Sequence, residues 1–325
     1  MLENLYLIHL DVKIWSGRRK LRLEDLHGVR LPEGADKVAS LGSKKVISPE
    51  ELLIFSRLKN RAERACREVG VRFLGGVAVP KERFQEALGP LNEAKAQFDE
   101  ETRKFLSRYE QACDEWVRAN PEWMEVLDRA RVEKQYVSNA LDFSFQVFQA
   151  RAVGGLDEES GAAFTKAVNS LPEQLFQEIA ADAQILWERT SAKDKVTQRA
   201  VTVVRRLHKK LQGLAMLDAG IGKSANWVER GLNALPKAGN VEGNDLRAFC
   251  ALVLVMQDKD ALLRIAQGEE PETNIAGIFP ADAPELPLEE DSSDSGPALA
   301  PKDDSTDTDT ENEEPPLEKA VGWFF

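Results

Sequence analysis

Two long runs of mainly apolar residues, spaced four or three positions apart, constrain the fold more than any other feature of this sequence. The first run lies between Pro80 and Val117, and Lys95 and Thr102 are its polar exceptions. Its members are Phe84, Leu88, Leu91, Lys95, Phe98, Thr102, Phe105, Tyr109, Cys113 and Trp116. Residues spaced in this way form one stripe on an α-helix, as in a coiled-coil seam. The run predicts a long helix, which Gly89-Pro90 would break or kink near its start.

The second run follows a turn at Asn120-Pro121 and has the same rhythm. Its members are Trp123, Leu127, Ala130, Lys134, Val137, Leu141, Ser144 and Phe148. Two matching stripes joined by a short turn predict an antiparallel, coiled-coil-like helical hairpin over residues 80–153. Such an arm is too thin to enclose a pocket, so we expect it to contact partners.

Residues 1–79 predict a small α+β region. Apolar and polar side chains alternate over residues 5–23, which predicts a β-hairpin that turns at Ser16-Gly17. A capping box at Ser48–Glu51 predicts a helix that ends at Gly70. Residues 71–79 predict one or two short strands, which we expect to join the hairpin in a sheet.

Residues 154–268 predict a helical bundle, because several amphipathic segments follow one another with short breaks. The predicted fold class is therefore mainly α with a small N-terminal β-sheet (α+β). It combines the long antiparallel helical hairpin with the C-terminal bundle, and a disordered acidic tail follows the bundle.

The composition changes sharply at about Gly268. Residues 269–325 hold 17 acidic and 2 basic residues, so they carry nearly all of the chain's net charge of −12. Residues 1–268 then have a net charge of +3. A proline-rich acidic segment buries too little apolar area to offset its ordering entropy, which predicts a disordered acidic tail over 269–325. Because the rest of the chain is nearly neutral, the overall acidity does not exclude a nucleic-acid partner.

The predicted tail has an aromatic C-terminal tip, formed by Trp323, Phe324 and Phe325. Burying two or three rings contributes several kcal/mol at about 25 cal/mol per Å². We expect the tip to dock, either on the chain's own body or on a partner, and the sequence leaves both alternatives open.

Basic residues gather at the turn of the predicted hairpin, where Arg18, Arg19 and Lys20 follow Trp15. Cations beside an aromatic ring can hold phosphates or an acidic protein surface. A second set of cations lies on one predicted helix, at Arg205, Arg206, Lys209 and Lys210. The alternative for both sets is a solvated surface balanced by nearby acids. We take Trp15, Arg18, Arg19 and Lys20, together with the aromatic tip, as candidate partner-binding residues.

Signals for catalysis are weak. Residues 220–224 resemble the end of a P-loop, but Leu217 occupies the position of the first glycine and no strand is predicted before it. His9 and Asp11 would share one face of the first strand. A solvated strand surface explains this pair more simply than acid–base chemistry does. We predict no catalytic residue.

The three cysteines and three histidines lie far apart in the sequence. This scatter predicts neither a zinc site nor a disulfide framework, and we expect no metal and no cofactor. No segment approaches the roughly 18 apolar residues of a membrane span, and the N-terminus lacks the features of a signal peptide. We therefore expect a cytoplasmic protein with no membrane association.

Several segments carry a family resemblance. They are LDVKIWSGRRKL at 10–21, LGSK at 41–44, PEEL at 49–52, GVRFLGG at 70–76 and LPKAG at 235–239. Together they resemble an uncharacterised bacterial family, a domain of unknown function carried by plasmids and integrative elements. Members of that family are often encoded near a MoxR-like AAA+ ATPase and a von Willebrand factor A-type protein.

The resemblance implies a non-enzymatic adaptor or accessory protein of such a mobile-element system, with these two proteins as partners. The alternative is a nucleic-acid-binding accessory factor of a plasmid or integrative element, which would hold DNA through Arg18, Arg19 and Lys20. An enzyme of unrecognised type is the third hypothesis. The resemblance covers residues 5–260 and assigns no catalytic residue.

Overall fold

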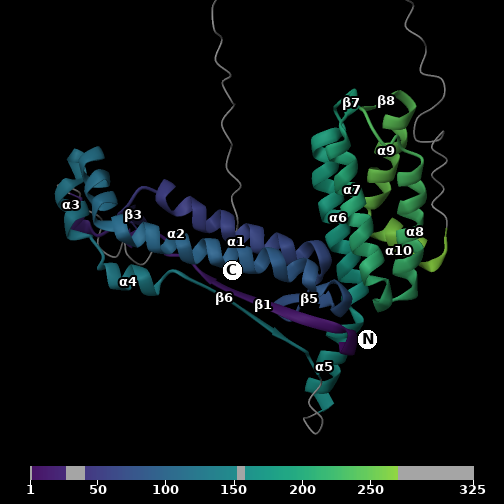
Figure 1. Cartoon of the computed structure of the whole chain (residues 1–325), viewed down its shortest axis with the longest axis horizontal. Helices are drawn as coiled ribbons and strands as arrows, with labels where there is room; N and C mark the ends of the chain where they lie inside the picture. The colour runs from purple at the N-terminus through teal and green to yellow at the C-terminus, as the bar shows by residue number, and fades with distance from the viewer. Residues whose placement is uncertain (1, 27–40, 152–157, 270–325) are drawn as a thin grey trace, which may run out of the picture. The chain divides into compact units, whose positions relative to one another are not determined.

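The computed structural model describes residues 2–26, 41–151 and 158–269, all within one compact unit. This part of the chain is mainly helical, with a small antiparallel sheet built around its N-terminal strand (Figure 1). The predicted fold class is confirmed. The predicted acidic tail from 270 onward lies outside the described residues.

The sheet has four strands in the order β4-β5-β1-β6. Strand β1 (Leu5–Lys13) pairs antiparallel with β5 (Gly76–Pro80) on one edge and with β6 (Asp142–Phe148) on the other. Strand β4 (Val71–Phe73) pairs antiparallel with β5. The strands predicted within residues 71–79 therefore join the first strand, as expected.

The predicted hairpin over residues 5–23 is wrong. Strand β2 (Arg18–Lys20) pairs with β3 (Ser43–Lys45) and not with β1. The chain that leaves β1 turns at Gly17 toward residues 43–46 instead of folding back along β1, whose pairing with β5 covers only Leu5–Ile8 and whose pairing with β6 covers Leu7–Lys13. Gly17 turns the chain with φ +65°, and its carbonyl accepts a hydrogen bond from Val46 N at 2.9 Å.

The long helix predicted from the first apolar run is confirmed as α2 (Phe84–Ala119), which continues through Pro90. It lies antiparallel to α1 (Glu50–Val69), as Figure 1 shows. Phe55 of α1 packs edge-on against Phe98 and Phe105 of α2, with ring centroids 5.0 and 5.9 Å apart. A long antiparallel helical hairpin is present, and α1 and α2 are its arms.

The second arm predicted over residues 120–153 is wrong. That segment folds into two short helices, α3 (Met124–Arg129) and α4 (Lys134–Asn139), followed by strand β6. Residues 143–147 read Phe-Ser-Phe-Gln-Val, an alternation of period two that suits a strand pairing with β1. The same residues also fit a spacing of four and three, which led to the prediction of a helix.

The predicted helical bundle is also present. Its helices are α5 (Glu158–Asn169), α6 (Leu171–Thr190), α7 (Gln198–Leu214), α8 (Ala219–Asn233), α9 (Gly243–Met256) and α10 (Lys259–Gln267) (Figure 1). Two short strands, β7 (Lys195–Val196) and β8 (Val241–Glu242), pair between the helix connections. Single 3-10 turns lie at Leu2–Asn4, Leu23–Asp25, Lys81–Arg83, Pro121–Trp123 and Ala215–Leu217.

The two faces of the sheet belong to two hydrophobic cores. Leu5 and Leu7 of β1 pack into the core of the bundle, whereas Ile8 packs into the core formed with α1 and α2. Successive side chains of a strand point to opposite faces, so one strand can serve both cores.

The predicted division of the chain into four parts, at residues 79, 153 and 268, stays a prediction.

Replacing Phe55 with alanine tests the packing between α1 and α2. Phe55 is fully buried between two aromatic rings, so Phe55→Ala should lower the free energy of unfolding by about 3–5 kcal/mol. Leu53→Ala is the matched control, because Leu53 lies on the same helix and is 47% exposed. Urea denaturation measures both, and equal effects of the two substitutions would contradict the packing.

Candidate functional site

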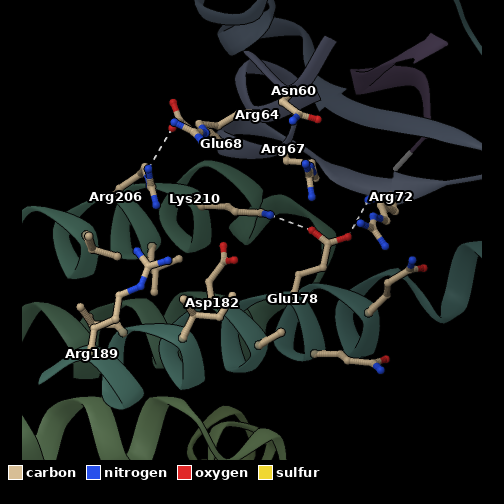
Figure 2. Close-up of a pocket in the computed structure, with 17 residues that line it drawn as sticks. Asn60, Arg64, Arg67, Glu68, Arg72, Glu178, Asp182, Arg189, Arg206 and Lys210 are labelled. Atoms are coloured by element: carbon tan, nitrogen blue, oxygen red, sulfur yellow. Dashed lines mark hydrogen bonds and ion pairs between the residues drawn. The ribbon is translucent and has the colours of Figure 1, made fainter. Parts of the chain in front are cut away.

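A groove of about 850 Å³ opens between α1, the start of β4, and helices α6 and α7 (Figure 2). Its long wall is α6, which lines the groove from Gln174 to Arg189. At 1.5 Å per residue this wall is about 22 Å long. The groove is therefore elongated, with room for an extended ligand.

Charge is the dominant feature of the groove. Its lining holds three acidic side chains, Glu68, Glu178 and Asp182, and twice as many basic ones. The basic side chains are Arg64, Arg67, Arg72, Arg189, Arg206 and Lys210. A concave surface with a surplus of three positive charges attracts anionic groups.

The base of the groove is a buried ion pair. Lys210, which is 3% exposed, donates from Nζ to Glu178 Oε2 at 2.7 Å. The other carboxylate oxygen of Glu178 accepts a hydrogen bond from Arg72 N at 2.9 Å, so Glu178 lies between Lys210 and Arg72 (Figure 2). Removing either partner would leave a buried charge unpaired, which gives this pair a structural role.

A second ion pair crosses the groove near its rim, where Arg206 of α7 donates to Glu68 of α1 at 3.0 Å. Both side chains are about two-fifths exposed, so the pair adds little to stability. Breaking this ion pair costs little free energy, so Arg206 can exchange Glu68 for an anionic group of a ligand.

Three other cations keep their hydrogen-bonding capacity for a ligand. Within the described part of the chain, the guanidinium groups of Arg64, Arg72 and Arg189 form neither an ion pair nor a hydrogen bond. All three residues are exposed and line the groove. A guanidinium group binds carboxylates and phosphates with two parallel hydrogen bonds. These arginines are the donors that the site offers.

The structure places the residues predicted to bind partners at a different location. Arg18, Arg19 and Lys20 are exposed on β2 and do not line the groove. Trp15 is 6% exposed and packs edge-on against Tyr109, with ring centroids 5.8 Å apart. The indole therefore belongs to the core and offers little exposed surface beside the three cations. Trp323, Phe324 and Phe325 lie outside the described residues, and partner binding by the three cations stays a prediction.

The second predicted set of cations divides between two places. Arg206 and Lys210 line the groove, whereas Lys209 pairs with Glu86 at 2.9 Å. The arginines of α1, β4 and α6 were missed by the sequence analysis. Each of them lies among other charged residues on an amphipathic segment. No spacing in the sequence shows that elements more than 100 residues apart line the same groove.

The P-loop-like segment is helical and does not form a loop. Residues 220–224 lie inside α8, where Ser224 is buried and donates to Leu262 O at 3.1 Å. Burial raises the pKa of the Cys66 thiol to about 12 and raises the pKa values of Cys113 and Cys250 as well. These thiols stay protonated near neutral pH, which makes them poor nucleophiles.

Among the described residues, no three His, Cys, Asp or Glu side chains lie together so that they could hold a metal ion. Within the same residues, no helix is long and apolar enough to span a membrane.

The fold and the groove define a mainly helical α+β protein with an anion-attracting surface. The chain belongs to the family described as Protein of unknown function (DUF3150), whose model matches residues 2–258. This match confirms the resemblance to a family of unknown function. No curated protein and no solved structure matches the chain.

An ion cluster beside the groove links α7 to the start of α2. Glu86 accepts hydrogen bonds from Arg83 at 3.0 Å and from Lys209 at 2.9 Å, and Arg83 also donates to Lys209 O. The hydrogen bonds from Arg83 and then Lys209 lower the pKa of Glu86 to about 2. The ionised carboxylate is therefore part of the contact between these elements.

This cluster predicts a specific pH dependence of stability. The folded-state pKa of Glu86 lies below the usual 4.5, so its contribution is present above pH 4.5 and is lost as the pH falls toward 2. Glu86→Gln should cost less than about 1 kcal/mol at pH 7, because the side chain is 40% exposed.

Urea denaturation at pH 7, 5 and 3 measures the difference between wild type and Glu86→Gln. Glu82→Gln is the control, since Glu82 lies on the same segment, is exposed and forms no ion pair with other described residues. A wild-type advantage over Glu86→Gln that stays constant from pH 7 to pH 3 would contradict the role of the cluster.

Proposed function

We propose that this protein is a non-enzymatic adaptor that holds an acidic segment of a partner protein in the cationic groove. The observation that supports this function most directly is the set of Arg64, Arg72 and Arg189. These three guanidinium groups line a positively charged groove, and no ion pair satisfies them in the part of the chain that the structure describes.

The length of the groove favours a chain-like ligand over a small ion. A single phosphate or carboxylate would engage one or two of the arginines, whereas Arg64, Arg72 and Arg189 lie on three different elements. An extended acidic peptide, at about 3.3 Å per residue, would need six or seven residues to follow the 22 Å wall of α6. Carboxylates on such a peptide would pair with successive guanidinium groups.

The partners that we propose are the two proteins implied by the family resemblance. These are a MoxR-like AAA+ ATPase and a von Willebrand factor A-type protein, within a plasmid or integrative element. The full chain should co-purify with one or both when the three are expressed together. Failure to retain either protein would exclude this pair while leaving the groove open to another acidic partner.

Charge reversal in the groove tests the adaptor function. The triple variant Arg64→Glu, Arg72→Glu, Arg189→Glu should weaken binding of a fluorescent oligo-glutamate peptide at least about tenfold, because three charge-assisted pairs are lost. The matched control is Arg57→Glu, Arg199→Glu, Arg247→Glu, which makes the same change at exposed arginines outside the groove. Fluorescence anisotropy at 50 mM salt measures both, and equal losses would contradict a specific groove.

Nucleic acid is the second candidate ligand, favoured by the exposed cations Arg18, Arg19 and Lys20 on β2. If the alternative is correct, the full chain should shift a DNA fragment at low salt and release it steeply as salt rises. Replacing the three cations with glutamate should abolish the shift. The absence of any shift at low salt would rule out this alternative.

A further inference from the structure

The cationic groove continues into a second cavity of about 530 Å³. The two spaces share Arg67, Arg72 and Gln174 in their linings. Beyond these shared residues and Glu63, the cavity is lined mainly by apolar side chains and glycines. The apolar ones are Ile8, Leu10, Phe73, Leu74, Val77 and Ala167. A positively charged groove therefore leads directly into a cavity that has apolar side chains on one part of its lining and polar ones on the rest.

Leu74 is the unusual member of this lining. It lies with Gly75 in the two-residue turn between β4 and β5, and it is the one non-glycine residue with positive φ (46°) among those described. Asparagine or glycine is preferred at such a position, because a branched side chain is strained there. The side chain is nevertheless 55% exposed beside the cavity. Strain that is retained to present a large apolar side chain points to a role in binding.

We infer that the groove and the cavity form one site, which binds an acidic segment of a partner protein followed by a bulky aromatic side chain. This inference rests on the proposed function and adds the ligand class. The carboxylates would pair with Arg64 and Arg189, and the ring would enter the cavity beside Leu74 and Phe73. Arg67 and Arg72, at the junction, can contact both the acidic part and the face of the ring.

The cavity, at about 530 Å³, has room for one aromatic side chain. An aromatic side chain can bury about 150–250 Å² of surface, and the part of it that meets the apolar lining is favoured. A purely acidic ligand would leave the cavity unused, and a purely apolar one would leave three arginines unpaired. The site therefore favours a ligand that carries both carboxylates and an aromatic ring.

Two synthetic peptides test the inference. Both have the same acidic segment of seven residues, and one continues with tryptophan where the other has alanine. The full chain should bind the tryptophan peptide at least about tenfold more tightly in fluorescence anisotropy. Equal affinities would overturn the inference and leave the adaptor function standing, whereas no binding of either peptide would overturn both. Tighter binding of a single-stranded DNA oligonucleotide of equal charge would overturn the choice of a protein ligand.

The substitution Leu74→Asn separates binding from folding. Asparagine tolerates the left-handed turn, so the urea midpoint of unfolding should rise or stay unchanged, while the preference for tryptophan should fall below about threefold. Leu53→Asn is the control, because Leu53 is exposed on α1 and does not line the cavity. A stable Leu74→Asn variant that keeps the full tryptophan preference would exclude the cavity as the aromatic site.

The sequence of this chain itself contains an acidic stretch followed by Trp323, Phe324 and Phe325. The triple alanine variant of these three residues should bind the tryptophan peptide with unchanged affinity if the occupant comes from a partner. A gain of more than about threefold would show that the chain's own aromatic residues compete. That result would overturn the assignment of the site to a partner protein.

Discussion

Strand β1 holds the described structure together, because its two faces belong to two different hydrophobic cores. Leu5 and Leu7 pack with the helical bundle, and Ile8 packs with the α1–α2 hairpin. Both edges of the strand are paired as well, which fixes β5 and β6 on either side of it. Since helices pack against both faces of the sheet, α1 and β4 come close to α6 and α7, and their polar faces define the groove. The binding surface is thus a consequence of how the sheet is buried.

The same arrangement explains the balance of charges in the groove. Apolar side chains of the helices are used in the two cores, so the surfaces that meet at the groove are the charged faces of amphipathic helices. The side chains of Lys210 and Glu178 are largely buried, so each charge needs the other as a partner, whereas Arg64 and Arg189 remain at the surface. One ion pair therefore stabilises the contact, and the remaining arginines supply the attraction for an anionic segment.

The sequence predicted the elements whose signals are local. The seam from Leu91 to Cys113 identified α2, and the amphipathic segments after residue 154 identified the bundle. It failed where pairing over long distances decides the structure. Residues 143–147 form a strand because β1 offers them an edge, and β2 pairs with β3, which is more than 20 residues away in the sequence. The groove could not be predicted for the same reason, since Arg72 and Glu178 meet only through the fold.

Hydrogen exchange of the full chain, with and without the acidic tryptophan peptide, locates the surface that binds such a ligand. Amide hydrogens become protected where a ligand binds or orders the backbone. Added protection is expected at residues 60–77, along α6 and along the second half of α7, with no change on β2. Protection confined to residues 18–20 and 43–45, or absent from all three segments of the groove despite binding, would contradict it.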